Sequence, residues 1–176
     1  MPTTDSILTE PFTRKDYQQL PEGFPAELID GMLVRQPPPT AWHQGLVIRI
    51  AHRLHSVVGP DRAIVSPVDV AIDEHNVLQP DLLLLAEEDR VRPGMKQVAL
   101  PLMVFEVLSP STARRDRLVK ADNYLRAGVR EVWLVDPDAG TIEIRTRDGA
   151  TVFDANDEAR SMVLPDFGLT FHELAG

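Results

Sequence analysis

Apolar positions recur along the chain with two spacings, one typical of helices and one typical of strands. Between about Thr40 and Val58 they return every three or four residues, which predicts one amphipathic helix. His43 falls on the apolar side of this helix, whereas His52 and His55 fall on the opposite side. We therefore expect His43 to be the buried histidine of the three.

Short apolar runs predict strands at 66–72, 77–85, 101–108 and 131–135. The run at 101–108 is almost continuously apolar, which is typical of a strand buried on both faces. A helix that follows this run and ends at Gly128 leads into 131–135. The strands at 101–108 and 131–135 should therefore be parallel.

Turn and cap signals add three smaller elements. Asp30-Gly31 and Asp148-Gly149 each separate runs of strand-forming residues, which predicts two hairpins. Thr13 with Asp16 resembles a capping box that opens a short helix ending at about Leu20. Together the elements predict an α/β (α+β) fold with a mixed central sheet flanked by helices, an N-terminal hairpin and C-terminal strands.

The composition suits one domain. The chain has 176 residues, 43% of them hydrophobic, so we expect a single domain over 1–176 with a flexible tail at about 1–12. We expect a cytoplasmic protein, because no apolar run is long enough for a membrane span and the N-terminus lacks a signal-peptide pattern. Without cysteine, any metal must be held by carboxylate, imidazole or carbonyl groups.

The charge is unevenly distributed. A net charge of −9 argues against a protein that coats nucleic acid with its whole surface. A local basic patch is still possible, because six of the 18 basic residues fall within 114–130. A solvated helix face explains the same residues without a ligand.

Two carboxylates interrupt apolar strands. Asp81 lies within 77–85 and Glu106 within 101–108, where an unpaired charge is costly to bury. If these strands are neighbours, their alternation brings the two side chains together in an oxygen-lined site suited to Mg²⁺ or Mn²⁺. The alternative is that each carboxylate caps backbone groups or pairs with an arginine.

Four segments occur in a distinctive order: ELIDG at 27–31, QPDLLLL at 79–85, FEVLSPST at 105–112 and KADNYLRAGVREVWLVDP at 120–137. In this order they resemble the Uma2 family of restriction-endonuclease-like proteins, a branch of the PD-(D/E)XK nuclease superfamily. The resemblance runs from about Thr13 to Leu174. It implies metal-dependent hydrolysis of phosphodiesters in nucleic acid, with DNA as the expected substrate. A second Pro-Asp pair at 165–166 is followed by no matching acidic strand.

The resemblance also implies roles for the acidic residues. Asp81 would be the aspartate that bridges the metal or metals, and Glu106 would be the second acidic ligand. The backbone carbonyl of Val107 would be a further oxygen ligand. The superfamily expects a lysine two residues after the second acid, to orient or deprotonate water and to offset phosphorane charge. That position is Leu108 in this chain, which puts full catalysis in doubt unless another cation replaces it.

Lys120 is the best substitute, because a helix that starts directly after the acidic strand can reach back over the site. The alternative is an ordinary pair with Asp116 on a solvated helix face. Glu27 would be an additional acid that aids metal or water binding, or else a glutamate at a strand edge.

Further residues are candidates for contacts with the carboxylates or with the substrate. His43 could hydrogen-bond a carboxylate, a phosphate or water, or be a satisfied core histidine. The junction between a parallel strand and a helix N-terminus favours an anion, although capping explains the same residues. The remaining candidates are Gln79 and Asp69 near the carboxylates, and Ser109, Ser111, Arg114 and Arg115 at the junction.

The leading interpretation is therefore a Mg²⁺- or Mn²⁺-dependent endonuclease. One alternative is a catalytically weak nucleic-acid-binding or protein-interaction domain that keeps the nuclease fold. Another is a phosphoesterase acting on small molecules. A homodimer is expected, with the strands after Thr141 as the partner edge. Serine-hydrolase elbows, Walker A loops, dinucleotide fingerprints and zincin motifs are absent from the sequence.

Overall fold

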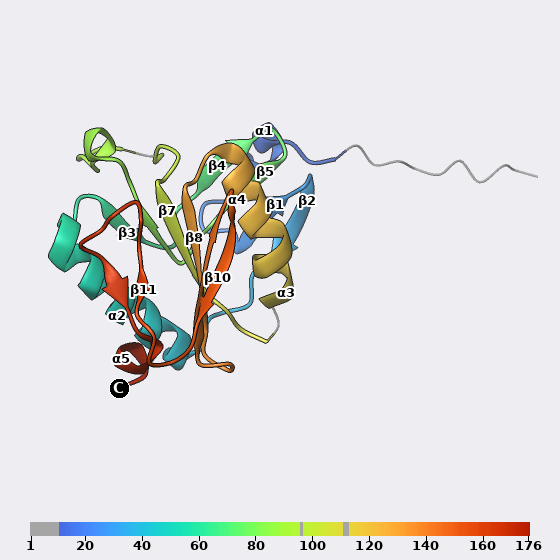
Figure 1. Ribbon diagram of the computed structural model, residues 1–176. Helices are drawn as coiled ribbons and strands as arrows, with labels where there is room; N and C mark the ends of the chain where they lie inside the picture. The colour runs from blue at the N-terminus through green and yellow to red at the C-terminus, as the bar shows by residue number, and fades with distance from the viewer. Residues whose placement is uncertain (1–10, 96, 111–112) are drawn as a thin grey trace, which may run out of the picture.

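The computed structural model describes residues 11–95, 97–110 and 113–176 (Figure 1). Most of the tail expected at about 1–12 lies outside the described residues. Its last residue does not behave as a tail, because the Phe12 N–H donates to the carbonyl of Gly31 at 2.8 Å. The chain is therefore held against the first hairpin from Phe12 onward.

A six-stranded mixed sheet forms the centre of the fold. Strands β7 and β8 are parallel, as predicted, and every other neighbouring pair is antiparallel. Their segments are the predicted apolar runs at 101–108 and 131–135. In spatial order the strands are β10 (Gly149–Phe153), β9 (Thr141–Thr146), β8 (Glu131–Asp136), β7 (Met103–Val107), β6 (Leu82–Leu84) and β3 (Ala63–Val65).

Two smaller sheets accompany it. The first is antiparallel throughout and contains the hairpin predicted at Asp30-Gly31, where both turn residues have the positive φ that this turn requires. In spatial order its strands are β2 (Met32–Arg35), β1 (Ala26–Ile29), β5 (Asn76–Leu78) and β4 (Val70–Asp73). The second pairs β11 (Ala159–Arg160) with β12 (Gly168–Leu169).

The helices differ greatly in length. Thr40 caps the long helix α2 by accepting from the N–H of His43, and Thr13 with Asp16 forms the predicted capping box of α1. Helix α1 ends at Tyr17 rather than near Leu20. None of the described helices is both long and apolar enough to cross a membrane. The helical segments are α1 (Arg14–Tyr17), α2 (Ala41–Val58), η1 (Glu87–Asp89), α3 (Ala113–Arg115), η2 (Asp116–Lys120), α4 (Ala121–Ala127) and α5 (Phe171–Ala175).

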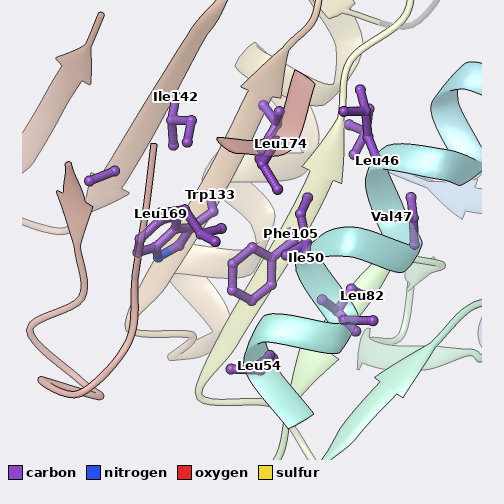
Figure 2. Close-up of a cluster of buried hydrophobic side chains, with 14 of the residues drawn as sticks. Leu46, Val47, Ile50, Leu54, Leu82, Phe105, Trp133, Ile142, Leu169 and Leu174 are labelled. Carbon is purple, nitrogen blue, oxygen red and sulfur yellow. The ribbon is translucent and has the colours of Figure 1, made fainter. Parts of the chain in front are cut away.

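Helices cover both faces of the central sheet. Leu46, Ile50 and Leu54 of α2 pack on one face, against Phe105 and Trp133 (Figure 2). The rings of Phe105 and Trp133 lie 5.4 Å apart between centroids. Helix α4 packs on the other face together with the smaller four-stranded sheet (Figure 1). Strands β7 and β8 are thus buried on both sides, which explains their continuous apolar sequences.

The strand predicted at 77–85 is wrong as one element. The chain leaves the four-stranded sheet after Leu78 and enters the six-stranded sheet at Leu82. Pro80 lies in between, and its missing N–H is unsuited to a continuous ladder. The strand predicted at 66–72 likewise begins only at Val70.

The prediction for the three histidines of α2 is only partly correct. The side chain of His43 is 15% exposed and therefore half-buried, because the first turn of α2 lies at the edge of the core. His52 is exposed as expected. His55 is also half-buried, since its ring contacts the Ala63 carbonyl at 2.8 Å.

Candidate active site

Asp81 and Glu106 lie side by side at the junction of β6 and β7. The register pairs Leu82 with Phe105, and one residue beyond that pair the strands bring Asp81 next to Glu106. The backbone N–H of Val107 donates to Asp81 Oδ2 at 2.8 Å. The prediction that these two acidic strands are neighbours is confirmed.

Lys120 contacts Glu106 on the face of the sheet that α4 covers. Its Nζ lies 2.7 Å from Glu106 Oε1, 3.0 Å from Glu27 Oε1 and 3.7 Å from Asp116 Oδ1. Its side chain is 4% exposed, so the alternative of a lysine on a solvated helix face is wrong. Lys120 ends a π-helical turn in which the N–H of Ala121 donates to the carbonyl of Asp116. Such turns are frequent at functional sites.

Glu27, on β1, is the second carboxylate that Lys120 contacts closely. Its carboxylate is fully buried and accepts from the backbone N–H of Gln79 at 2.6 Å. Its other oxygen accepts from the side-chain amide of Gln36. Arg115 donates to the same Gln36 side chain at 2.9 Å, so the α3 helix is connected to β1 through one glutamine.

His43 contacts the carboxylate of Asp81. Its Nε2 lies 3.1 Å from Asp81 Oδ2. The hydrogen bond with Asp81 raises the pKa of His43, and partial burial opposes that rise. The buried Nδ1 of the ring has no partner among the described residues.

Carboxylates outnumber cations in this cluster. Burial raises the pKa of Glu106 well above its usual range; Lys120 opposes this rise, and Asp116, Asp81 and Glu27 add to it. Burial by itself would lower the pKa of Lys120, but Glu106 and its fellow carboxylates outweigh burial and raise it. Four carboxylates thus lie around two permanent cations, Lys120 and Arg115.

The cluster opens into a cavity of about 520 Å³. Its walls come from the connection between β2 and α2, from the first turn of α2, and from the segments that follow β3, β5 and β7. Seven predicted site residues line it: His43, Gln79, Asp81, Glu106, Val107, Ser109 and Lys120. Glu27 lies farther from the cavity and is connected to it by its ion pair with Lys120.

Comparison with known proteins confirms the resemblance found in the sequence. Residues 14–172 match the model of the Uma2 family, which is described as "Putative restriction endonuclease". The chain belongs to the Uma2 family. Among curated proteins, none matches it.

A solved structure similar to this Uma2 protein is described as that of "a putative nuclease belonging to DUF820 from Anabaena variabilis ATCC 29413". The two share 23% sequence identity and superpose with a TM-score of 0.81, over 93% of this chain and 97% of the other. At that identity the comparison establishes the fold, a mixed α/β architecture shared with a nuclease-like protein.

Some predicted site residues of the Uma2 chain do not line the cavity. Asp69 lines a separate cavity, where it accepts from the hydroxyl of Tyr17 at 3.0 Å, and it meets the site only through Gln79. Arg115 contacts Gln36 and Asp116, which places it behind the cavity wall. Ser111 and the side chain of Arg114 lie outside the described residues. Leu108 is buried in an apolar cluster with Val104 and Leu134.

Sequence reasoning missed three residues of the site. Asp116 was considered only as a surface partner of Lys120, yet its side chain is 6% exposed. Tyr124 donates to Glu106 Oε1 at 3.2 Å. Asp116, Lys120 and Tyr124 recur every four residues, a helical spacing that would have indicated one shared face. Gln36 comes from an irregular segment and carries no such signal.

The donor set fits a hard divalent cation. Asp81 and Glu106 offer carboxylate oxygens on one cavity wall, and the carboxylates of the cluster outnumber its cations. In the described ranges, no three carboxylate or imidazole groups converge closely enough to surround a metal by themselves. A bound cation would therefore complete its coordination with water, a backbone carbonyl and substrate oxygen, as Mg²⁺ commonly does.

Proposed function

We propose that the protein is a metal-dependent endonuclease that hydrolyses phosphodiester bonds in DNA. The observation that carries the proposal is the position of Lys120, whose ammonium group lies 2.7 Å from Glu106 although Leu108 occupies the expected lysine position. A chain with only a retained fold has no need to bury a lysine among three carboxylates. The Uma2 membership supports the same activity.

Asp81 and Glu106 would hold Mg²⁺ or Mn²⁺, with the carbonyl of Val107 as a further ligand. When bound, the cation supplies positive charge at a phosphate oxygen and at the attacking water. His43 keeps the carboxylate of Asp81 oriented, because its ring nitrogen and the N–H of Val107 both contact the same oxygen.

Lys120 would act on the phosphate directly. Its ammonium group lies beside the metal-binding wall, so it can donate to the oxygens that gain negative charge as the phosphodiester is attacked. Glu27 holds the lysine in place through a 3.0 Å ion pair and is itself fixed by Gln36 and Gln79. Glu27 and Gln36 are therefore positioning residues for Lys120.

A cleavage assay tests this proposal. The purified chain should cleave DNA, supplied as plasmid and as single strands, with Mn²⁺ or Mg²⁺ and lose this activity with a chelator. Asp81→Asn should abolish cleavage while leaving the thermal midpoint nearly unchanged, because Asp81 is half-buried and accepts few bonds. Asp166→Asn is the matched control, since Asp166 also follows a proline but is exposed and outside the cavity. Metal-independent activity, or full activity of Asp81→Asn, would contradict the proposal.

We also propose a homodimer. Strand β10 pairs with β9 and ends the six-stranded sheet in the described part of the chain, and most of its residues are exposed. An unpaired edge of this kind can accept a strand from a second copy. Light scattering after size-exclusion chromatography should give twice the mass of the 19.6 kDa chain, and a monomer mass would contradict the proposal.

A further inference from the structure

The mouth of the active-site cavity is lined by apolar residues, whereas its floor is lined by charged residues. Five exposed prolines line the mouth on several sides: Pro37, Pro38, Pro39, Pro67 and Pro110. The charged residues that line the cavity are buried or half-buried and lie in the cluster around Glu106. A substrate must therefore pass rigid apolar surfaces before its phosphate reaches the carboxylates.

The charge of the lining suits one strand better than two. Duplex DNA carries a phosphate charge about every 1.7 Å along its axis, twice the density of a single strand. Among the described residues of the lining, the lysine and the histidine, Lys120 and His43, are both in contact with carboxylates. The whole chain has a net charge of −9. Little positive charge is thus available at this opening for a second strand.

An exposed aromatic residue belongs to the helical turn that borders the cavity. Trp42 is in the first turn of α2, between Thr40 and His43, which both line the cavity. The indole is 46% exposed, although a tryptophan at this apolar spacing would ordinarily be buried. The guanidinium of Arg49 lies 5.5 Å from its ring centroid. Exposed aromatic rings next to arginines are the means by which single-strand-binding proteins stack bases and hold phosphates.

We propose that the substrate of this site is unpaired DNA. A single strand would enter between the prolines, with one base stacked on Trp42 and the neighbouring phosphate at the wall where Asp81 and Glu106 would hold the cation. A cavity of about 520 Å³ falls in the range of sites that enclose a small molecule, such as one nucleotide. This inference rests on the proposed nuclease function and specifies its substrate.

The test compares one labelled DNA strand, alone and annealed to its complement, as substrates of the full chain with Mn²⁺. The single strand should be cleaved several-fold faster than the duplex. Trp42→Ala should raise KM for the single strand at least about fivefold, because base stacking on an aromatic ring is lost, with kcat nearly unchanged. Ile48→Ala is the matched control on the same helix, where Ile48 is 63% exposed. Trp42→Phe should restore most of the affinity.

Binding can also be followed without cleavage. The chain has two tryptophans, and Trp133 is fully buried, so quenching of tryptophan fluorescence by the single strand reports on Trp42. Cleavage of the duplex at an equal or higher rate, or an unchanged KM in Trp42→Ala, would overturn the inference and leave the nuclease proposal standing. Absence of cleavage for both DNAs would instead contradict the nuclease proposal, and the inference would fall with it.

Discussion

Lys120 and Glu106 form an ion pair of 2.7 Å, although one belongs to a π-helical turn and the other to the central strand β7. Both side chains are 4% exposed, so each charge depends on the other for compensation. Removing one partner of a buried pair typically costs more than the pair contributes, because the remaining charge stays buried.

Lys120→Met should therefore impair both function and stability. We expect the rate of DNA cleavage to fall at least about a hundredfold, because the charge facing the attacked phosphate is lost. The free energy of unfolding should fall by about 3 kcal/mol, because Glu27 and Glu106 lose their shared cation. Urea denaturation and initial rates measure the two effects. Lys15→Met on the exposed side of α1 is the control and should change neither.

Arg145 should matter for activity although it lies away from the cavity. Its guanidinium donates to the carbonyl of Arg117 at 2.6 Å, inside the turn that ends at Lys120, and Glu143 holds it there. Arg145→Met should lower kcat more than it changes KM, because the turn no longer fixes Lys120. Arg160→Met is the control, because Arg160 is exposed and contacts Glu158 and the carbonyl of Pro165. Identical kinetics for the Arg145 variant and the wild type would show that the π-helical turn keeps its conformation without Arg145.

Glu131 is predicted to be structural. Its buried carboxylate accepts from the Trp133 indole N–H, the Ser161 hydroxyl and the backbone N–H groups of Met162 and Val163. Glu131→Gln replaces one acceptor by a donor that faces these donors, so the free energy of unfolding should fall by about 1–3 kcal/mol. The cleavage rate per folded molecule should not change. Chemical denaturation tests this, with exposed Glu158→Gln as the control.

The two tyrosines predict the response to alkaline pH. Burial raises the pKa of Tyr17, with Asp69 adding to the rise, and burial with Glu106 raises the pKa of Tyr124. A raised folded-state pKa contributes stability that is complete below the unfolded value of about 10 and is lost as pH rises above it. Tyrosinate absorbance should therefore appear together with unfolding. Ionisation of either tyrosine near pH 10 in a folded protein, judged by circular dichroism, would be inconsistent with this.

The proximity of the two acidic residues of the candidate site could be predicted, because side chains alternate with a period of two along strands. Asp81 and Glu106 are acidic positions in apolar runs, and β6 and β7 are neighbours with the register that brings them together. Helix α2 and both hairpins were likewise predictable, since the apolar spacing and the Asp-Gly pairs are local signals. The family resemblance indicated the type of reaction, hydrolysis of phosphodiesters.

Other features depend on contacts between segments far apart in the chain, which no local sequence pattern predicts. The chain passes from one sheet to another at Pro80, but apolar residues stand on both sides of this point, so 77–85 resembles one strand in the sequence. The π turn before Lys120 is supported by Arg145 from a strand 25 residues later in the chain. Gln36 reaches Glu27 from a proline-rich connection without periodicity.

The central claim is that Asp81 and Glu106 together hold a divalent cation beside Lys120. The most direct test is an anomalous-scattering map from a crystal soaked in Mn²⁺. The account predicts a peak within about 2.5 Å of carboxylate oxygens from both residues. A map with no peak at this wall, or with Mn²⁺ bound only elsewhere on the protein, would contradict it.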